Sequence, residues 1–167
     1  MRPTLGRTRE TLFNWLRPHI DDCTCMDLFA GSGILGFEAL SQGARQVTFV
    51  ERHRATLQGI KAIAQDLNCE NQCQFFSRDA RAVLRSGVQH DILFIDPPFA
   101  EPRLLTETLA LLTEEHVQFQ YAYVEIPAKL QIEAVAQEHG LSVNKLTNAG
   151  GTTSALLTKQ FSDGGGG

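Results

Sequence analysis

The 167-residue sequence has few cysteines, a single tryptophan and no long apolar run. A membrane-spanning helix needs about 18 or more apolar residues in succession, and no segment approaches that length, so we expect no contact with a membrane. The opening Met1-Arg2-Pro3 leads into a charged segment and not into the apolar stretch of a secretory signal. These absences predict a cytoplasmic protein.

The four cysteines show none of the spacings that hold a metal ion. Cys23 and Cys25 are separated by one residue, Cys69 and Cys73 by three, and no histidine pattern accompanies either pair. Structural zinc sites usually combine C-x-x-C pairs with further cysteine or histidine ligands. We therefore expect reduced, partly buried thiols and no metal.

The sequence also lacks the net positive charge that is common in nucleic-acid enzymes, since its formal charge is −4. Lysine and arginine normally supply much of the affinity for phosphate. The arginines are nevertheless unevenly placed. One group opens the chain and a second group lies near the later motifs: Arg2, Arg7, Arg9 and Arg17, then Arg78, Arg81, Arg85 and Arg103. A basic N-terminal edge on an acidic body predicts local phosphate contact.

Apolar runs alternate with helical patterns from Cys25 onward, which is typical of strand–helix–strand units around a parallel sheet. Glycines and turn residues close the helices, and Asn148 to Gly151 are predicted to form the turn of a final antiparallel hairpin. The predicted strands are 25–29, 47–51, 74–77, 92–95, 121–125, 141–146 and 155–158. We expect an α/β, Rossmann-like, mostly parallel sheet of seven strands with helices on both faces.

The domain organisation is predicted to be simple. At this length and hydrophobic content the chain can fill one core, so residues 1–160 are expected to form one domain. A short helix over about residues 8–17, with Leu12, Trp15 and Leu16 on one face, is expected to pack on the sheet edge. Residues 161–167 are predicted to be a disordered tail, and we expect a monomer.

A glycine-rich segment joins the first predicted strand to the first helix. It contains G-x-G-x-x-G at Gly31, Gly33 and Gly36. Glycines allow sharp turns and let a ligand approach the backbone closely. The predicted contacts in this segment are Asp27, Phe29, Ala30, Gly31, Ser32 and Gly33. The motif alone suits a dinucleotide as well as S-adenosylmethionine.

Acidic residues at three strand ends favour a nucleoside ligand. Glu51 is placed to accept hydrogen bonds from ribose hydroxyls, and Asp79 from an adenine amino group. Arg52 and Ala80 follow these acids directly and are predicted to contact the same ligand. Because ligands bind at the carboxyl edge of open parallel sheets, these residues are expected to meet in one site.

The segment Asp96-Pro97-Pro98-Phe99 follows a strand of four apolar residues. Two prolines stiffen the loop and supply carbonyl acceptors. An exocyclic amine of a base is a poor nucleophile, and the Asp96 carboxylate with the Pro97 carbonyl would hold its lone pair toward a sulfonium methyl. Phe99 would stack on the base. The sequence thus predicts methyl transfer from S-adenosylmethionine, with all four residues in the catalytic loop.

These motifs resemble a known family. D-P-P-F is similar to the N-P-P-Y or D-P-P-Y motif of amino-methyltransferases, and the segment from Arg2-Pro3-Thr4 through Leu16 resembles the opening of the RsmD family. The resemblance implies the class I methyltransferase fold, S-adenosylmethionine as cofactor, and methylation of the N2 of a guanine in 16S ribosomal RNA or the small-subunit particle. The predicted RNA contacts are Arg2, Thr4, Arg7, Arg9 and Phe99, and the resemblance implies the roles given above to Gly31, Gly33, Glu51, Asp79 and Asp96.

Two departures from the family pattern affect these expectations. Family members usually begin with a basic β-hairpin, whereas this sequence starts at the Arg-Pro-Thr segment, so we expect a truncated or shortened homologue with weaker RNA affinity. Gly6 stands where the family generally has an aspartate, which removes any role of that carboxylate in ordering the N-terminal loop.

Three other functions fit parts of the sequence. An NAD-dependent oxidoreductase would use the glycine loop and Glu51, but neither Tyr121 nor Tyr123 has the lysine four residues later that short-chain dehydrogenases use. A DNA or other RNA amino-methyltransferase, acting on adenine N6 or cytosine N4, would also use D-P-P-F. A non-catalytic module could bind the nucleoside cofactor and transfer nothing.

Overall fold

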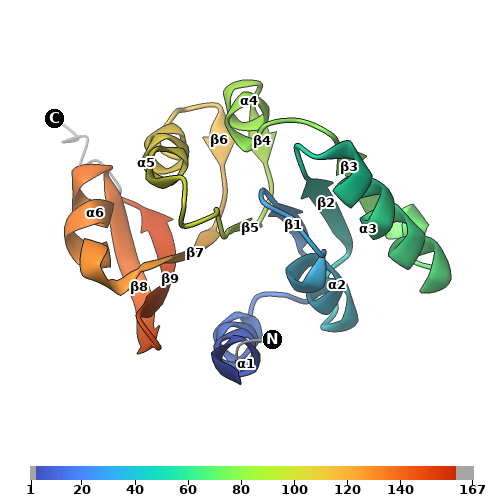
Figure 1. Cartoon of the computed structure of the whole chain (residues 1–167), viewed down its shortest axis with the longest axis horizontal. Helices are drawn as coiled ribbons and strands as arrows, with labels where there is room; N and C mark the ends of the chain where they lie inside the picture. Colours follow the sequence, from blue (N-terminus) through green and yellow to red (C-terminus); the bar gives the residue numbers. More distant parts are fainter. Residues whose placement is uncertain (1–2, 161–167) are drawn as a thin grey trace, which may run out of the picture.

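A computed structural model describes residues 3–160, with side chains described from Gly6 onward (Figure 1). None of the helices in that range is long and apolar enough to cross a membrane. In chain order the elements are α1 (Pro3–Leu16), β1 (Thr24–Asp27), α2 (Ile34–Ser41), β2 (Gln46–Val50), α3 (Arg54–Asp66), η1 (Glu70–Gln72), β3 (Cys73–Phe76), α4 (Ala80–Arg85), β4 (Val88–Gln89), β5 (Ile92–Ile95), α5 (Pro102–Leu111), β6 (Val117–Gln118), β7 (Tyr121–Pro127), η2 (Ala128–Leu130), α6 (Ile132–Glu138), β8 (Leu141–Ala149) and β9 (Thr152–Lys159).

The main sheet has seven strands in the order β3-β2-β1-β5-β7-β9-β8. The first five are parallel to one another, whereas β9 runs antiparallel to both β7 and β8. All four residues of β5 are buried, as expected of a central parallel strand that is covered on both faces. The observed topology confirms the predicted fold class, including the terminal hairpin.

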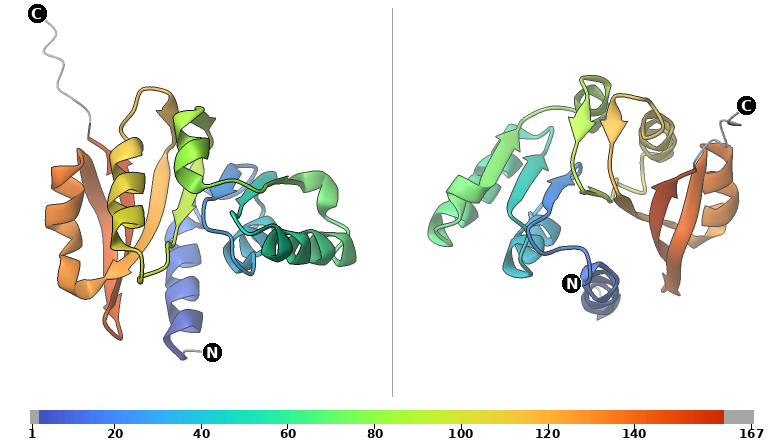
Figure 2. Two further views of the ribbon diagram at one scale, coloured as in Figure 1. Left: turned by 45° about the horizontal axis from the view of Figure 1, so that its top comes forward. Right: turned by 180° about the vertical axis from the view of Figure 1, so that it is seen from behind.

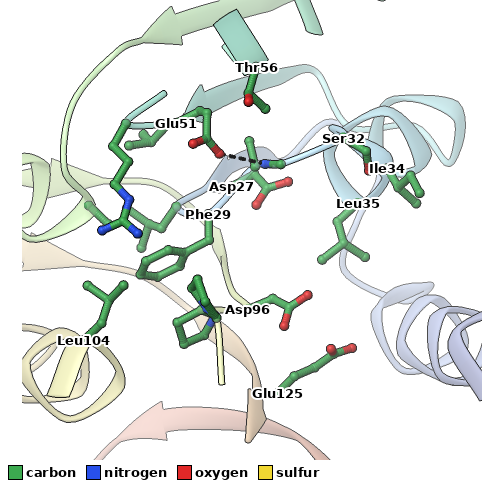
Figure 3. A pocket seen from close by; sticks show the side chains of 18 of the residues that line it. Asp27, Phe29, Ser32, Ile34, Leu35, Glu51, Thr56, Asp96, Leu104 and Glu125 are labelled. Atoms are coloured by element: carbon green, nitrogen blue, oxygen red, sulfur yellow. Dashed lines mark hydrogen bonds between the residues drawn. The ribbon is translucent and has the colours of Figure 1, made fainter. Parts of the chain in front are cut away.

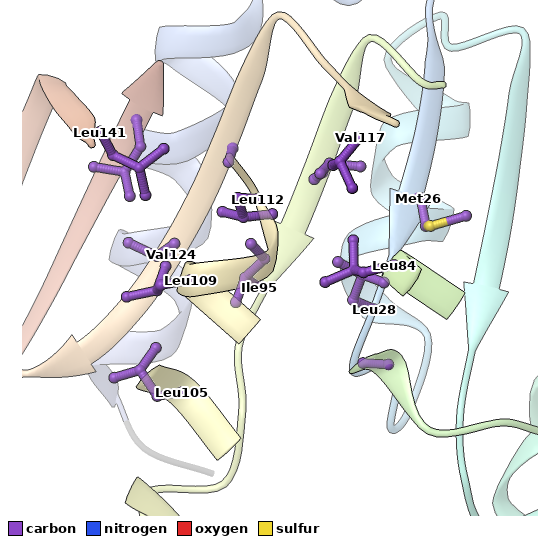
Figure 4. Packing of buried hydrophobic residues seen from close by; sticks show 14 of the residues in the cluster. Met26, Leu28, Leu84, Ile95, Leu105, Leu109, Leu112, Val117, Val124 and Leu141 are labelled. Carbon is purple, nitrogen blue, oxygen red and sulfur yellow. The ribbon is translucent and has the colours of Figure 1, made fainter. Parts of the chain in front are cut away.

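Alternation along β5 separates two hydrophobic layers. Leu93 and Ile95 join the core beneath α4, α5 and α6 (Figure 4), while Ile92 and Phe94 join the core beneath α1, α2 and α3. Successive side chains of a strand point to opposite faces of the sheet, so this one strand contributes to both layers. The two views in Figure 2 show the helices on the two sides of the sheet.

Helix α1 begins earlier than predicted, at Pro3. It contacts the edge strand β8, as expected of a helix packed at the sheet edge. Its apolar side chains reach further across the sheet, because Leu12, Phe13 and Leu16 pack in one cluster with Tyr123 and Leu156. Helices α2 and α3 contact β1, β2 and β3 on the same face of the sheet. The part of this face that they leave uncovered, over β5, β7 and β9, is covered by the apolar side of α1.

Two short features were not predicted. Helix α4 has six residues and begins after Asp79, whose side chain accepts a hydrogen bond from the Arg81 backbone N–H. Strands β4 and β6 pair in a separate two-stranded sheet, with two residues in each strand. Both features are too short to produce a period of hydrophobic residues in the sequence.

The terminal hairpin is longer than predicted because its turn is tighter. The predicted turn of four residues is reduced to Gly150 and Gly151, whose φ angles are 58° and 80°. Two-residue hairpin turns with positive φ match the twist of the flanking strands and favour glycine. Pairing therefore continues to Ala149 and Thr152.

Gly36 permits the close contact of α2 with the sheet. A Cβ atom added there would lie 2.3 Å from the Phe49 ring and 2.9 Å from Val47. Phe49 is fully buried and stacks on Phe75 with 5.7 Å between ring centroids, so it has little freedom to move. The third glycine of the motif thus serves helix–sheet packing.

We expect Gly36→Ala to lower the free energy of unfolding by about 2–3 kcal/mol, as overpacking of a filled core does. Gly59→Ala is the matched control, because a Cβ at Gly59 in α3 would meet nothing within 4 Å and alanine favours a helix over glycine by about 0.5–1 kcal/mol. Urea unfolding of both variants measures the difference. Equal stability of the two variants would contradict the packing assignment.

Candidate active site

A pocket of about 660 Å³ opens at the carboxyl ends of β1, β2 and β5, a size in the range of nucleoside-sized ligands. It is lined by ten of the eleven residues predicted to bind the cofactor, by all four residues of the D-P-P-F loop, and by Glu125. Figure 3 shows labelled side chains from several strands converging on this space. The structure therefore brings the two predicted motifs into one pocket.

The glycine loop presents backbone to the pocket at Gly31. Its φ is 54°, and a Cβ there would meet only the Phe29 carbonyl oxygen, at 3.9 Å, so the approach is open. Gly33 does not line the pocket. A Cβ there would lie 2.8 Å from the Phe37 ring, and its φ of 82° is left-handed, so this glycine shapes the turn at the start of α2.

Glu51 is anchored to the glycine loop. One carboxylate oxygen accepts the Gly31 backbone N–H at 3.0 Å, drawn as the dashed line in Figure 3, and the other accepts the His53 backbone N–H at 3.1 Å. Each ionised oxygen has further acceptor capacity. Glu51 can therefore hold the loop and still accept hydroxyl hydrogens from a ligand.

Asp79 has protein partners that the sequence did not predict. Its carboxylate caps α4 and is gripped by the Arg81 guanidinium at 2.8 and 3.0 Å. Hydrogen bonds from the Arg81 side chain lower the pKa of Asp79 to about 2, and Arg81 also pairs with Glu107. Asp79 lines the pocket next to buried Ala80, but part of its capacity to accept hydrogen bonds is already used by Arg81.

Arg52 ties two sides of the pocket together. It pairs with Glu101 at 2.6 Å, and Glu101 lies just after the D-P-P-F loop. Both side chains are about two-fifths exposed, so the pair adds little stability. It does hold the loop after β2 near the loop after β5.

Asp27 is buried beneath the glycine loop with one unsatisfied oxygen. Its side chain lines the pocket, is 1% exposed, and its Oδ1 atom has no hydrogen-bond partner. Burial raises the pKa of Asp27 to about 7, although the backbone N–H groups of Phe29 and Gly36 oppose the rise. A cationic group in the pocket would pair with this carboxylate. The site therefore fits a ligand that carries a positive charge.

Asp96 closes β5 at the other side of the same space. Burial, and then the neighbouring Glu125 carboxyl, raise the pKa of Asp96 to about 8. Pro97 beside it is buried, while Pro98 and Phe99 are exposed. With 41% of its surface accessible, the Phe99 ring can receive a planar group.

Glu125 is a pocket residue that the sequence analysis did not single out. It lies in β7, next to β5, and accepts a hydrogen bond from the buried Tyr123 hydroxyl. The signal was available, because Glu125 closes a predicted parallel strand, as Glu51 and Asp96 do. The rule that ligands bind at the carboxyl edge of the sheet would have found it.

The predicted RNA-binding residues are only partly described. Arg9 lines the pocket with Thr8, whereas Arg7 is exposed on α1 outside the pocket. Arg2 lies outside the described residues, as does the predicted tail 161–167, and the side chain of Thr4 is not described. Among the described residues, no group of three or more histidine, cysteine or acidic side chains could hold a metal ion.

Comparison with known proteins identifies a family and several relatives of this chain. A model of the family described as conserved hypothetical protein 95 matches residues 1–158. The ribosomal RNA small subunit methyltransferases D of Escherichia coli K12 and Haemophilus influenzae are 45% and 40% identical over 114 and 120 residues. These alignments cover 68% and 70% of this chain and 57% and 62% of the relatives, so the match spans less than two thirds of their length.

Solved structures agree with this family and fold. A candidate methyltransferase from Escherichia coli superposes with a TM-score of 0.83 at 36% identity, covering 93% of this chain and 88% of that one. The ribosomal protein L11 methylase of Lactobacillus delbrueckii has a TM-score of 0.78 at 16% identity, covering 95% of this chain and 80% of that one, and shows the fold alone. The expected class I methyltransferase fold is confirmed.

Asp27→Asn is expected to stabilise the ligand-free protein above neutral pH. In the unfolded chain Asp27 ionises near its ordinary pKa of 3.8, while burial delays ionisation in the folded protein to about pH 7. Wild-type stability should therefore fall between these pH values and stay low above pH 7. The variant should avoid this loss and gain on the order of 4 kcal/mol at pH 8.

Urea unfolding at pH 4.5, 6 and 8 measures the effect, with the exposed Asp66→Asn as control. The gain of Asp27→Asn over wild type should grow with pH, while Asp66→Asn should show no such trend. A stability difference that does not change with pH would contradict the assigned ionisation.

Proposed function

Since the chain belongs to the RsmD family, described as conserved hypothetical protein 95, we propose that it transfers a methyl group from S-adenosylmethionine to a guanine N2 amine of small-subunit ribosomal RNA. The observation that carries the proposal is that the glycine loop and the D-P-P-F loop line the same pocket. One loop suits a nucleoside cofactor and the other suits an amine that receives a methyl group.

The residues around the glycine loop would hold the cofactor. Glu51 would accept the ribose hydroxyls, Gly31 would let the backbone approach, and Asp27 would face the positively charged amino-acid end through its unsatisfied oxygen. Bound S-adenosylmethionine supplies a methyl group on a sulfonium, whose carbon–sulfur bond breaks with its electron pair passing to sulfur. No metal is needed for this chemistry, since the leaving group is already activated.

The D-P-P-F loop would orient the amine. The Asp96 carboxylate and the Pro97 carbonyl each accept one N–H, which turns the nitrogen lone pair toward the methyl carbon. As the nitrogen–carbon bond forms, the nitrogen becomes positively charged and gives up a proton toward Asp96 or solvent. Phe99 stacks on the base and keeps it flat against the loop.

Two observations support RNA as the substrate. The curated relatives are small-subunit ribosomal RNA methyltransferases by name, and Arg9 and Arg78 line the pocket while Arg7 is exposed on α1. Arginines beside the opening would contact phosphates that flank a base extruded into the pocket. Such an arrangement would allow a chain whose formal charge is negative to bind nucleic acid locally.

The test is to incubate the protein and labelled S-adenosylmethionine with unmodified small-subunit particles, and to map the label by mass spectrometry. We expect label on the exocyclic amine of a guanosine. Asp96→Ala should bind the cofactor normally and transfer at least about 100-fold more slowly, as when a charge-stabilising group is removed. The exposed Asp66→Ala should retain full turnover. Label on DNA alone, or unchanged turnover of Asp96→Ala, would overturn the assignment.

Glu51→Ala should weaken cofactor binding about tenfold, because one charge-assisted hydrogen bond contributes on the order of 1.5 kcal/mol. Calorimetric titration with S-adenosylhomocysteine measures the dissociation constant. Glu70→Ala is the control, since Glu70 is exposed and away from the pocket lining. An unaltered dissociation constant for Glu51→Ala would exclude the ribose contact.

A further inference from the structure

Glu125 and Asp96 stand side by side on neighbouring strands. Strands β5 and β7 pair in parallel up to Ile95 opposite Val124, so the next residues of the two strands are Asp96 and Glu125. Both line the pocket, and Figure 3 shows their carboxyl groups turned to the same side of it. The Glu125 carboxyl is close enough to help raise the pKa of Asp96.

A hydrogen bond and strand pairing fix the position of Glu125. Tyr123, two residues earlier on the same strand, is fully buried and donates its hydroxyl hydrogen to Oε1 of Glu125. The backbone is fixed by antiparallel pairing with β9, where Glu125 lies opposite Ser154. The carboxyl group itself lines the pocket, beside Asp96. A buried hydroxyl that orients a half-buried acid is the arrangement expected of a preorganised acceptor.

We propose that Glu125 selects guanine as the methylated base by accepting its ring N1–H, while Asp96 accepts a hydrogen of the adjacent exocyclic amine. This inference rests on the proposed amine methylation and adds the residue that recognises the ring. Glu125 would thus be a specificity-determining residue that contacts the substrate and takes no part in methyl transfer.

The hydrogen-bonding groups beside the exocyclic amine of each base explain why Glu125 would favour guanine. Guanine carries N1–H beside its amine, so three hydrogens face the Asp96 carboxylate, the Pro97 carbonyl and the Glu125 carboxylate. Adenine and cytosine carry a ring nitrogen with a lone pair beside their amines. An ionised Glu125 would face that lone pair without a hydrogen between them, and a desolvated, unpaired acceptor is costly.

The charges in the pocket agree with this assignment. Without ligand, the raised pKa of Asp96 means that this carboxyl is largely protonated near neutral pH. The N–H donors of guanine can replace that proton, and a sulfonium nearby would offset the negative charge. Asp27 and Tyr123 are the other ionisable groups that bear on this carboxylate pair.

The experiment compares two substrates that differ at the ring nitrogen. Once the methylated guanosine is mapped, small-subunit particles are rebuilt on RNA carrying guanosine or 2-aminopurine riboside at that position, introduced by splinted ligation. 2-Aminopurine keeps the amine but has a lone pair at N1. Wild type should methylate guanosine about 10–100-fold faster, the range expected for a hydrogen bond to a charged group.

Glu125→Gln should reduce this preference to less than about threefold, because the glutamine amide can donate to N1 of 2-aminopurine. Glu125→Ala should also reduce it, by slowing guanosine alone. 2-Aminopurine also lacks the O6 atom, but that loss affects wild type and variants equally and cancels in the comparison. Glu133→Gln, an exposed acid on α6, is the matched control and should keep the wild-type preference.

The outcomes separate this inference from the proposed function. If wild type labels no small-subunit RNA, the proposed function fails. If wild type labels guanosine but both Glu125 variants slow the two substrates equally, Glu125 is structural and this inference is overturned. Label on an adenine or cytosine amine would also overturn it, while leaving amine methylation intact. Cofactor titration and urea unfolding of each variant confirm that the proteins compared are folded.

Discussion

The parallel pairing of β1 with β5 is the constraint on which the pocket depends. Asp27 lies opposite Phe94 in this register, and the Leu28 backbone N–H donates to the Phe94 carbonyl at 3.1 Å. Both strands end at the same edge of the sheet, so the glycine loop leaves one and the D-P-P-F loop leaves the other. A slip of the register would separate the cofactor side from the side that would hold the amine.

The pocket gathers carboxyl groups at a cost in stability. Asp27 and Asp96 both have raised pKa values because burial disfavours their ionised forms, and Glu51, Asp79 and Glu125 line the same pocket. The fold tolerates this because the acids sit at strand ends, above two well-packed hydrophobic layers. Such unfavourable burial is typical of sites that bind or react, where a ligand supplies the missing charge.

Much of the fold could be predicted because hydrophobic periodicity is local. Buried β5 and the amphipathic stripe of α3 each appear within a few residues of sequence. The sequence placed α1 at the sheet edge, where it contacts β8. How far its apolar stripe reaches over the sheet could not be predicted, since such a stripe fits any apolar surface and only the assembled sheet shows which half remains uncovered. Strands β4 and β6 were not predicted, because two residues are too few to form a hydrophobic pattern.

The sequence by itself determined the order along the chain of the seven strands of the main sheet, the glycine loop and the D-P-P-F loop, because each depends on neighbouring residues. The tertiary structure decided how the glycines divide their roles, that Arg81 grips Asp79, and that Glu125 stands beside Asp96. The pairing of Glu125 with Asp96 and the packing of Gly36 against Phe49 join residues on different elements, while the Arg81–Asp79 pair is local but depends on how the side chains turn at the start of α4. They follow from strand register and side-chain packing, which no local pattern of residues encodes.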